Sequence, residues 1–384
     1  MSLDDALGWL RERLPAIETS LAELVSLNSF TAHREGCLAV ATRLESLLAM
    51  PGLSLTRIPG QRGGDHLVFG TAAPGAPVAL VGHLDTVFPP GSFEGYRVDG
   101  DLRRGPGVLD MKGGLVVVAF ALRALAEGGL LERVPLRLVI VADEEVGSPE
   151  GRIVIEEHVR GAREALVFEA GRAGDAIITR RKGTGTVTAQ ASGKAAHAGN
   201  QHREGVNAVW ALACFVDLAQ QLTRYDEGTT LNVGKFVGGQ VANTVPDRAD
   251  ALVDLRFTSL AQGEALVASL RQAAREAEAR VPGAVITLGG GLSRAPLERT
   301  SASAALRDRY AEAARAEGLG DGEAALLGGG SDACTTSALG IASIDGLGPR
   351  GKGFHTVDEQ IEVATLVPKA AALVRVLAAS AGAR

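Results

Sequence analysis

The chain has 384 residues, of which 46% are hydrophobic and 22% are charged, a composition that excludes an intrinsically disordered protein. Its length predicts two domains, because single hydrophobic cores seldom grow beyond about 250–300 residues. Acidic residues outnumber basic ones by 45 to 39, for a net charge of -6. This balance argues against a nucleic-acid partner, which would require a basic surface.

Cysteine usage and the N-terminal residues predict a cytoplasmic protein. Cys37, Cys214 and Cys334 are odd in number and widely spaced, so they form neither a disulfide framework nor a thiolate zinc site. We expect them to be small buried residues in a reducing compartment. Residues 1–5 are acidic and lack the basic start and apolar core of a signal peptide. No apolar stretch reaches the length of a membrane span without a charge or a glycine, so no membrane association is expected.

The first half of the chain alternates between helical and strand patterns. Helical periodicity occupies residues 7–27, 38–48, 115–125 and 153–159. Three runs are apolar almost throughout, with Arg137 the exception: 78–81, 136–141 and 165–168. Such runs are typical of strands buried on both faces of a mostly parallel sheet. The alternation predicts an α/β domain whose ligand site lies at the carboxyl ends of the strands.

The middle of the chain predicts a second, inserted domain. Strand patterns occupy residues 182–192, 230–237, 250–257 and 284–288, and helical patterns occupy 206–222 and 260–279. Their order, βαββαβ, is that of a ferredoxin-like α+β domain. We therefore predict an inserted domain at 179–290 and an α/β domain formed by 1–178 and 291–384.

The remaining elements complete this plan. The chain returns to the α/β domain from about Arg294, through a helix at 304–317, to a final helix at 366–377. Two glycine-rich stretches, 289–291 and 328–330, are predicted to be loops.

Potential metal ligands follow the apolar strands. They are His83 and Asp85 after 78–81, Asp143, Glu144 and Glu145 after 136–141, and Glu169 after 165–168. Asp110 lies in a glycine-rich segment just before a helix, and His355 follows Gly351 and Gly353 near the end of the chain. Because the carboxyl ends of the strands in such a sheet converge on one crevice, these side chains can meet.

Two histidines with several carboxylates and no thiolate suit zinc, cobalt or manganese. So many anionic groups require cations, since like charges would otherwise force protonation. Two metals bridged by one carboxylate, assigned to Asp110, would make a two-metal hydrolase. Asp85 is predicted to accept the imidazole N–H of His83. Of the adjacent glutamates, we assign Glu145 as a ligand and Glu144 as the base that takes a proton from the attacking water.

An ordered set of motifs resembles a known family. The motifs are His83-x-Asp85, Gly107-x-x-Asp110-Met-Lys-Gly-Gly, Asp143-Glu144-Glu145-x-Gly-Ser148, Glu169, Gly193-Lys-Ala-Ala-His197-Ala-Gly199 and Gly328-Gly-Gly-Ser-Asp332. Together they resemble the dizinc peptidase family that includes glutamate carboxypeptidase of the carboxypeptidase G type, acetylornithine deacetylase, succinyl-diaminopimelate desuccinylase and aminoacylase. The resemblance extends from about Val78 to the last helix. Each motif is weak alone, whereas the ordered set is specific.

The resemblance implies two Zn²⁺ ions per subunit, with Co²⁺ or Mn²⁺ as possible replacements. One ion would be held by His83, Asp110 and Glu169, and the other by Asp110, Glu145 and His355. The resemblance also implies that the inserted domain acts as a lid and joins two subunits into a homodimer. A cis peptide bond is expected between Asp110 and Met111.

Substrate contacts are also implied by the resemblance. His197 would reach the active site of the partner subunit and help to hold the oxyanion. Asn243 and Arg256 match positions of the inserted domain that contact substrate, and Arg294 resembles an arginine that binds the substrate carboxylate. A guanidinium group suits that role because its N–H donors match a carboxylate. Gly330 and Ser331 are the remaining expected substrate contacts.

Other interpretations of these residues remain open at this point. Arg256 could be an ordinary sheet-surface residue, Arg294 could pair with Glu298, and His197 could be a surface histidine. Cys334 has no activating histidine near it in the sequence, so a catalytic thiol is not expected. The remaining histidines are interpreted as structural: His33, His66, His158 and His202.

The function predicted from these residues is hydrolysis of an amide bond next to a free carboxylate, with release of a glutamate-like C-terminal amino acid. The substrate would be a small peptide or an N-acyl amino acid. An N-acyl-amino-acid deacylase is the alternative, and a non-catalytic scaffold of the same fold is a remote one. Ala170, where glutamate carboxypeptidases usually have proline, and Ser331, where threonine is frequent, leave the subfamily open.

Overall fold

The computed structural model describes residues 2–382. The chain divides into two compact units. The first contains the described residues up to Arg180, Arg299–Leu326 and those from Ser331 onward, and the second contains Arg181–Glu298 and Leu327–Gly330.

A six-stranded sheet forms the centre of the first unit. Its strand order is β1 (Ser54–Ile58), β2 (His66–Gly70), β6 (Leu136–Val141), β3 (Val78–His83), β7 (Glu164–Val167) and β14 (Ala342–Ile344). Strand β3 pairs in parallel with β6 and β7, and β14 extends the parallel part, whereas β1 and β2 are antiparallel. The predicted α/β class is confirmed, and the three predicted apolar runs are the central strands β3, β6 and β7.

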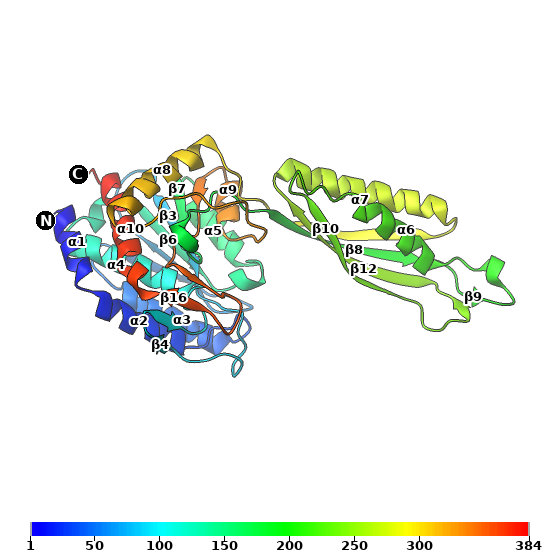
Figure 1. The fold of residues 1–384 in the computed structure, drawn as a ribbon, viewed down its shortest axis with the longest axis horizontal. Coiled ribbons are helices and arrows are strands. Elements are labelled where there is room, and N and C mark those ends of the chain that lie inside the picture. The colour runs from blue at the N-terminus through cyan, green and yellow to red at the C-terminus, as the bar shows by residue number, and fades with distance from the viewer. Residues whose placement is uncertain (1, 383–384) are drawn as a thin grey trace. The chain divides into compact units, whose positions relative to one another are not determined.

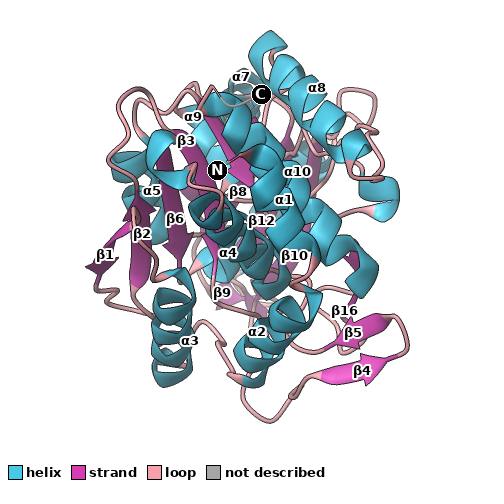
Figure 2. Cartoon of the chain, turned by 90° about the vertical axis from the view of Figure 1, so that its left-hand side faces the viewer, coloured by secondary structure: helices cyan, strands magenta, loops and turns pink. Residues whose placement is uncertain are grey.

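Helices enclose this sheet (Figures 1 and 2). They are α1 (Leu3–Arg11), α2 (Leu14–Ser26), α3 (Arg34–Leu48), α4 (Lys112–Glu127), α5 (Gly151–Val159), α8 (Ser301–Ala316), α9 (Ala333–Ala338) and α10 (Leu366–Ser380). Helix α4 is buried along most of its length and packs against α1, α2, α10 and β3. The helical stretch predicted at 7–27 is in fact two helices, because Pro15 lies in the first turn of α2 and starts a new helix.

The C-terminal helix has the composition of a core element. Among the described residues, one helical stretch, Val363–Ser380, is long and apolar enough to cross a membrane. The structure buries 61% of this stretch, and α10 packs against α4 and α8. Its apolar character is therefore explained by packing within the first unit.

A small antiparallel sheet also belongs to the first unit. Its order is β15 (Gly351–Lys352), β16 (Gln360–Glu362), β5 (Leu102–Arg104) and β4 (Arg97–Asp99). Gln360 pairs with Arg104, so the segment that ends at Glu359 lies beside the segment that begins at Gly105. The two segments carry His355 and Asp110, which are far apart in the sequence.

The second unit is a four-stranded antiparallel sheet with two helices on one face (Figure 1). The strand order is β10 (Thr230–Gly238), β12 (Arg248–Phe257), β8 (Gly183–Ser192) and β13 (Val285–Arg294), and the helices are α6 (Ala208–Gln220) and α7 (Leu260–Arg280). Their order along the chain is βαββαβ. Alternate residues of β8 and β12 are buried, as expected of strands that face helices on one side only.

Two details of the second unit differ from the sequence prediction. Strand β13 does not end at Leu288 but continues to Arg294, so Gly289–Gly291 pair with β8 instead of forming a loop. The sequence predicts that the strand ends at residue 288, before the three glycines, because glycine is unfavourable in strands. The predicted domain boundary after residue 290 therefore falls inside a strand. A short ribbon, β9 (Ala196–His197) with β11 (Thr244–Val245), is also present.

Candidate metal centre

Four side chains of the site lie at or just after the carboxyl ends of three neighbouring strands. His83 is the last residue of β3, Glu144 and Glu145 begin the turn after β6, and Glu169 follows β7 by two residues. Because β3 lies between β6 and β7 and is parallel to both, their carboxyl ends meet at one edge of the sheet.

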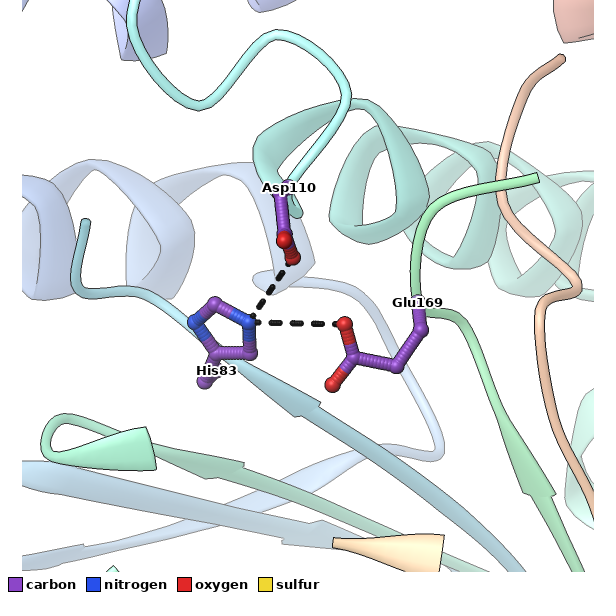
Figure 3. Close-up of side chains that lie close together, drawn as sticks. All are labelled: His83, Asp110 and Glu169. Carbon is purple, nitrogen blue, oxygen red and sulfur yellow. Dashed lines mark hydrogen bonds and ion pairs between the residues drawn. The ribbon is translucent and has the colours of Figure 1, made fainter. Parts of the chain in front are cut away.

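The first ligand group consists of His83, Asp110 and Glu169 (Figure 3). The Nε2 atom of His83 lies 3.3 Å from Oδ1 of Asp110 and 3.7 Å from Oε2 of Glu169. All three residues are buried. Burial, reinforced by the charge of Asp110, raises the pKa of Glu169 well above its usual value. A cation between these groups would relieve that cost.

The second group consists of Asp110, Glu145 and His355. The Nε2 atom of His355 lies 3.1 Å from Oε2 of Glu145 and 3.4 Å from Oδ2 of Asp110. Asp110 thus presents Oδ1 to His83 in one group and Oδ2 to His355 in the other. Burial raises the pKa of Glu145 to about 7, and its Oε1 atom is buried without a hydrogen-bond partner among the described residues.

These residues fit two cations. In each group the candidate ligand atoms lie within 4.8 Å of one another. The donors are imidazole nitrogens and carboxylate oxygens without thiolate, which suit zinc, cobalt or manganese. Buried polar atoms normally have a hydrogen-bond partner, so the buried Oε1 of Glu145, which has none among the described residues, fits a metal ligand. The structure thus brings all five predicted ligands together in two groups that share Asp110.

The backbone around the ligands is unusual in two places. The peptide bond between Asp110 and Met111 is cis, as the resemblance implied. His355 has a φ of 63°, which is rare for a residue other than glycine. Lys112, which follows the cis bond by one residue, is buried and donates from Nζ to the carbonyl of Leu27 at 2.8 Å.

The carboxylate of Asp85 lies near His83, as predicted, and it has further contacts that were not predicted. The Nδ1 atom of His83 lies 3.1 Å from the backbone carbonyl of Asp85 and 3.4 Å from its carboxylate. That carboxylate accepts the backbone N–H groups of Glu144 and Glu145 at 3.1 and 3.2 Å, and the hydroxyl of Thr31 at 2.7 Å. Asp85 therefore positions the turn that holds both glutamates. Its carbonyl fixes the proton of His83 on Nδ1, which leaves Nε2 for a metal.

Glu144 lies beside both ligand groups and belongs to neither. After burial, its charge is among the influences that raise the pKa of Glu145 and that of Glu169. It is partly exposed and begins the short helix η2 (Glu144–Val146). Glu144 is therefore the glutamate of this turn that stays outside the two ligand groups.

In the second unit, His197 and Asn243 lie together on the β9–β11 ribbon. His197 is exposed, and its Nδ1 accepts the backbone N–H groups of Gly199 and Asn200, each at 3.1 Å. Two donors at Nδ1 place the ring proton on Nε2. Asn243 precedes β11, and its carbonyl accepts the N–H of Ala198 at 3.0 Å. The ribbon thus presents His197 as a hydrogen-bond donor.

Two predicted arginines lie beside the loop 328–330. Arg256 donates from Nη1 to the carbonyl of Gly328 at 3.2 Å and also pairs with Asp254 at 2.9 Å. A side chain on Gly330 would place its Cβ 2.8 Å from Cδ of Arg294, so only glycine fits there without a shift. Arg256, Arg294 and Gly330 therefore form one cluster within the second unit.

Arg181 was missed by the sequence analysis and belongs to the same cluster. It is 5% exposed and donates from Nη1 to the carbonyl of Gly329 at 3.3 Å. In the sequence it stands inside the run Arg180-Arg181-Lys182, which looks like an ordinary solvated basic patch. The sequence signal that could have identified Arg181 is its position just before strand β8.

Ser331 does not have the environment expected of a substrate contact. It is 2% exposed, and its hydroxyl donates to Asp345 at 2.7 Å and accepts the N–H of Ala333 at 3.3 Å. It lies two residues before α9 in the first unit, whereas Gly330 belongs to the second. We therefore reassign Ser331 to the interior hydrogen bonds that start α9.

Histidines and carboxylates gathered at the ends of parallel strands, with a shared aspartate, define a metal-dependent hydrolase. The chain matches peptidase family M20/M25/M40 over residues 79–379 and belongs to this family. It is therefore an enzyme of the metallopeptidase type, and the scaffold alternative is set aside.

Two curated relatives cover most of the chain. Carboxypeptidase G2 of Pseudomonas sp. (strain RS-16) is 28% identical over 361 residues, covering 92% of this chain and 86% of the relative. A succinyl-diaminopimelate desuccinylase of Cereibacter sphaeroides is 30% identical over 389 residues, covering 93% of this chain and 96% of the relative.

Solved structures show the same fold. Aminopeptidase PepT from Bacillus cereus superimposes with a TM-score of 0.79 at 23% identity, covering 96% of this chain and 99% of that one. The M20 family metallo-carboxypeptidase Sso-CP2 from Sulfolobus solfataricus gives a TM-score of 0.72 at 17% identity, covering 94% and 99%.

Proposed function

We propose that this enzyme hydrolyses an amide bond next to a free carboxylate and releases a glutamate-like C-terminal amino acid from small peptides or N-acyl amino acids. The observation that carries the proposal is the pair of three-ligand groups that share Asp110, with Glu144 beside both. The similarity to carboxypeptidase G2 over 92% of the chain supports the choice of substrate class.

The five ligands would hold two Zn²⁺ ions, or Co²⁺ or Mn²⁺ in their place. His83 and Glu169 would complete one position and Glu145 and His355 the other, with Asp110 common to both. Ions held by these residues would supply a Lewis acid for the amide carbonyl and would lower the pKa of a water molecule to near neutrality.

The residues of the chain supply the proton transfers and the alignment. Glu144 takes the proton of the attacking water and returns it to the leaving nitrogen. The carboxylate of Asp85 holds Glu144 in place by accepting the backbone N–H of Glu144. His197 donates its Nε2 proton in a hydrogen bond to the developing oxyanion. The enzyme would be a cytoplasmic homodimer in which His197 of one subunit acts in the active site of the other.

Substrate recognition is assigned to the arginine cluster. Arg294 is proposed to bind the free carboxylate, because a guanidinium group offers paired N–H donors. Arg256, the backbone of Gly330 and Asn243 are the further proposed contacts. Arg181 is buried and supports the loop by donating to the carbonyl of Gly329.

The test is amide hydrolysis by zinc-loaded protein on matched acyl-glutamate, dipeptide and N-acetyl substrates, with a chelated sample as control. We expect chelator-sensitive release of a free amino acid, fastest from acyl-glutamates. Metal analysis should give two ions per chain. Two bound ions without hydrolysis of any substrate would contradict the proposed substrate class but not the site.

The second candidate is an N-acyl-amino-acid deacylase of the acetylornithine deacetylase or succinyl-diaminopimelate desuccinylase type. The observation that favours it is the 30% identity to a desuccinylase over 93% of the chain. Both activities would use the same ligands and base. Faster turnover of N-acetyl or N-succinyl amino acids than of acyl-glutamates would decide for the deacylase.

A further inference from the structure

A buried glutamate outside the ligand set binds the loop that carries Asp110. Glu359 is 0% exposed. Its Oε1 accepts the backbone N–H groups of Leu109 and Asp110 at 2.8 and 2.9 Å, and its Oε2 accepts that of Gly107 at 3.0 Å. A carboxylate taken fully out of water is costly unless donors surround it, and here the donors are three amides of one loop.

The loop that carries Asp110 makes two backbone hydrogen bonds of its own, from the N–H of Val108 to the carbonyl of Gly105 at 3.1 Å and from the N–H of Lys112 to that of Gly107 at 2.8 Å. Residues 105–111 join β5 to α4, and Gly105 and Gly107 have φ values of 154° and 73°. Glycine at such angles leaves the loop many alternative conformations. The buried amides of the loop need acceptors, and the two carboxylate oxygens of Glu359 accept three of these amides.

Glu359 also belongs to the segment that carries the other shared partner. It follows His355 by four residues and immediately precedes β16, which pairs with β5 in the register Gln360 to Arg104. The same segment therefore places Nε2 of His355 3.4 Å from Oδ2 of Asp110 and, through Glu359, accepts the backbone N–H of Asp110. The carboxylate joins two ligand loops that are remote in sequence.

We infer that Glu359 is a positioning residue for the metal centre: it fixes Asp110 relative to His355 and so controls how well both ions are held. The inference rests on the proposed role of Asp110 as the shared ligand. A residue that only stabilised the fold would affect unfolding without altering the geometry or affinity of the site.

The main test compares Glu359→Gln with Asp358→Asn. Glutamine keeps an oxygen for Leu109 and Asp110 but turns an NH₂ group toward the N–H of Gly107, whereas Asp358 is the exposed neighbour and undergoes the same chemical change. Supports of metal ligands change affinity by about 10–100-fold when they are lost. We expect zinc affinity to fall by about that factor in Glu359→Gln, and the visible spectrum of the cobalt-substituted protein to shift. Asp358→Asn should match the wild type in both measurements.

A second measurement avoids reliance on a variant that fails to fold. Hydrogen exchange of the wild type, with and without zinc, reports on the amides of Leu109 and Asp110. We expect these amides to stay protected after the metal is stripped, since Glu359 accepts them without help from an ion. Free exchange without zinc would overturn the inference, as would wild-type zinc affinity and cobalt spectrum in Glu359→Gln.

These results are separable from the proposed hydrolysis, because none of them requires turnover. Wild-type protein that binds two ions but cleaves no amide would refute the proposed function and leave the role of Glu359 intact. Chelator-sensitive hydrolysis by the wild type, together with normal zinc binding by Glu359→Gln, would support the proposed function and refute the role of Glu359.

Discussion

The carboxylate of Asp85 accepts the backbone N–H of Glu144 at 3.1 Å, so a residue that follows one strand sets the position of a residue that follows the next. Asp85→Asn should weaken this link, because an amide offers one acceptor oxygen where the carboxylate serves two amides. We expect kcat to fall by about 10–100-fold, as for other losses of support around a metal centre. Steady-state kinetics checks this, and Thr31→Ser, which keeps the hydroxyl that contacts Asp85, is the matched control.

Glu144→Ala should separate chemistry from metal binding. Glu144 lies beside both ligand groups without belonging to either, so the variant should retain both ions. Loss of a general base should lower kcat by about 10²–10⁴-fold. Metal analysis and turnover of the same preparation check the prediction, and near-normal turnover would show that another group is the base.

Asp110→Ala should remove both metals, since one carboxylate faces both groups. Glu169 belongs only to the first group, so Glu169→Ala should leave the second ion bound. Metal stoichiometry after dialysis distinguishes the two variants. One ion retained by Asp110→Ala would mean that the groups are independent.

His197→Ala should lower turnover without loss of metal, because His197 lies on the β9–β11 ribbon and not among the ligands. If it acts on the partner subunit, mixing it with Glu144→Ala should create hybrid dimers with one complete site. Random assortment of two subunits predicts recovery to about a quarter of wild-type activity. An inactive mixture whose hybrids are verified by mass spectrometry would exclude action across the dimer.

Cys37 should be inert to alkylation in the native protein. It is fully buried, and burial raises the pKa of its thiol from 9.0 to about 12. The neutral thiol is favoured in the folded state, so its contribution to stability is complete below pH 9 and is lost as the pH rises toward 12. Iodoacetamide labelling at pH 8 followed by peptide mapping should modify Cys37 only after unfolding, with the half-buried Cys214 labelled earlier.

The sequence predicted the elements with strong periodicity. Strands β3 and β6 are apolar because they are buried on both faces, and the residues at their ends are ligand types because the parallel strands converge there. The resemblance to a known family then implied which ligands belong together. Local composition was sufficient for the strands, and the grouping of the ligands came from the resemblance.

Features that depend on tertiary contacts could not be predicted. Strands β15 and β16 have two and three residues, too few for a pattern, although they bring His355 beside Asp110. Glu359 and Arg181 look like ordinary charged residues until the fold buries them. The contact of Asp85 with His83 could be predicted because the two are close in sequence, whereas its hydrogen bonds to the N–H groups of Glu144 and Glu145 join the ends of two strands and could not.

The two ligand groups differ in their access to solvent. The side chain of His83 is 1% exposed and that of His355 is 49% exposed. Solvent therefore reaches the centre from the side of His355. We expect an ion held by the second group to exchange with the surrounding solution faster than an ion held by the first.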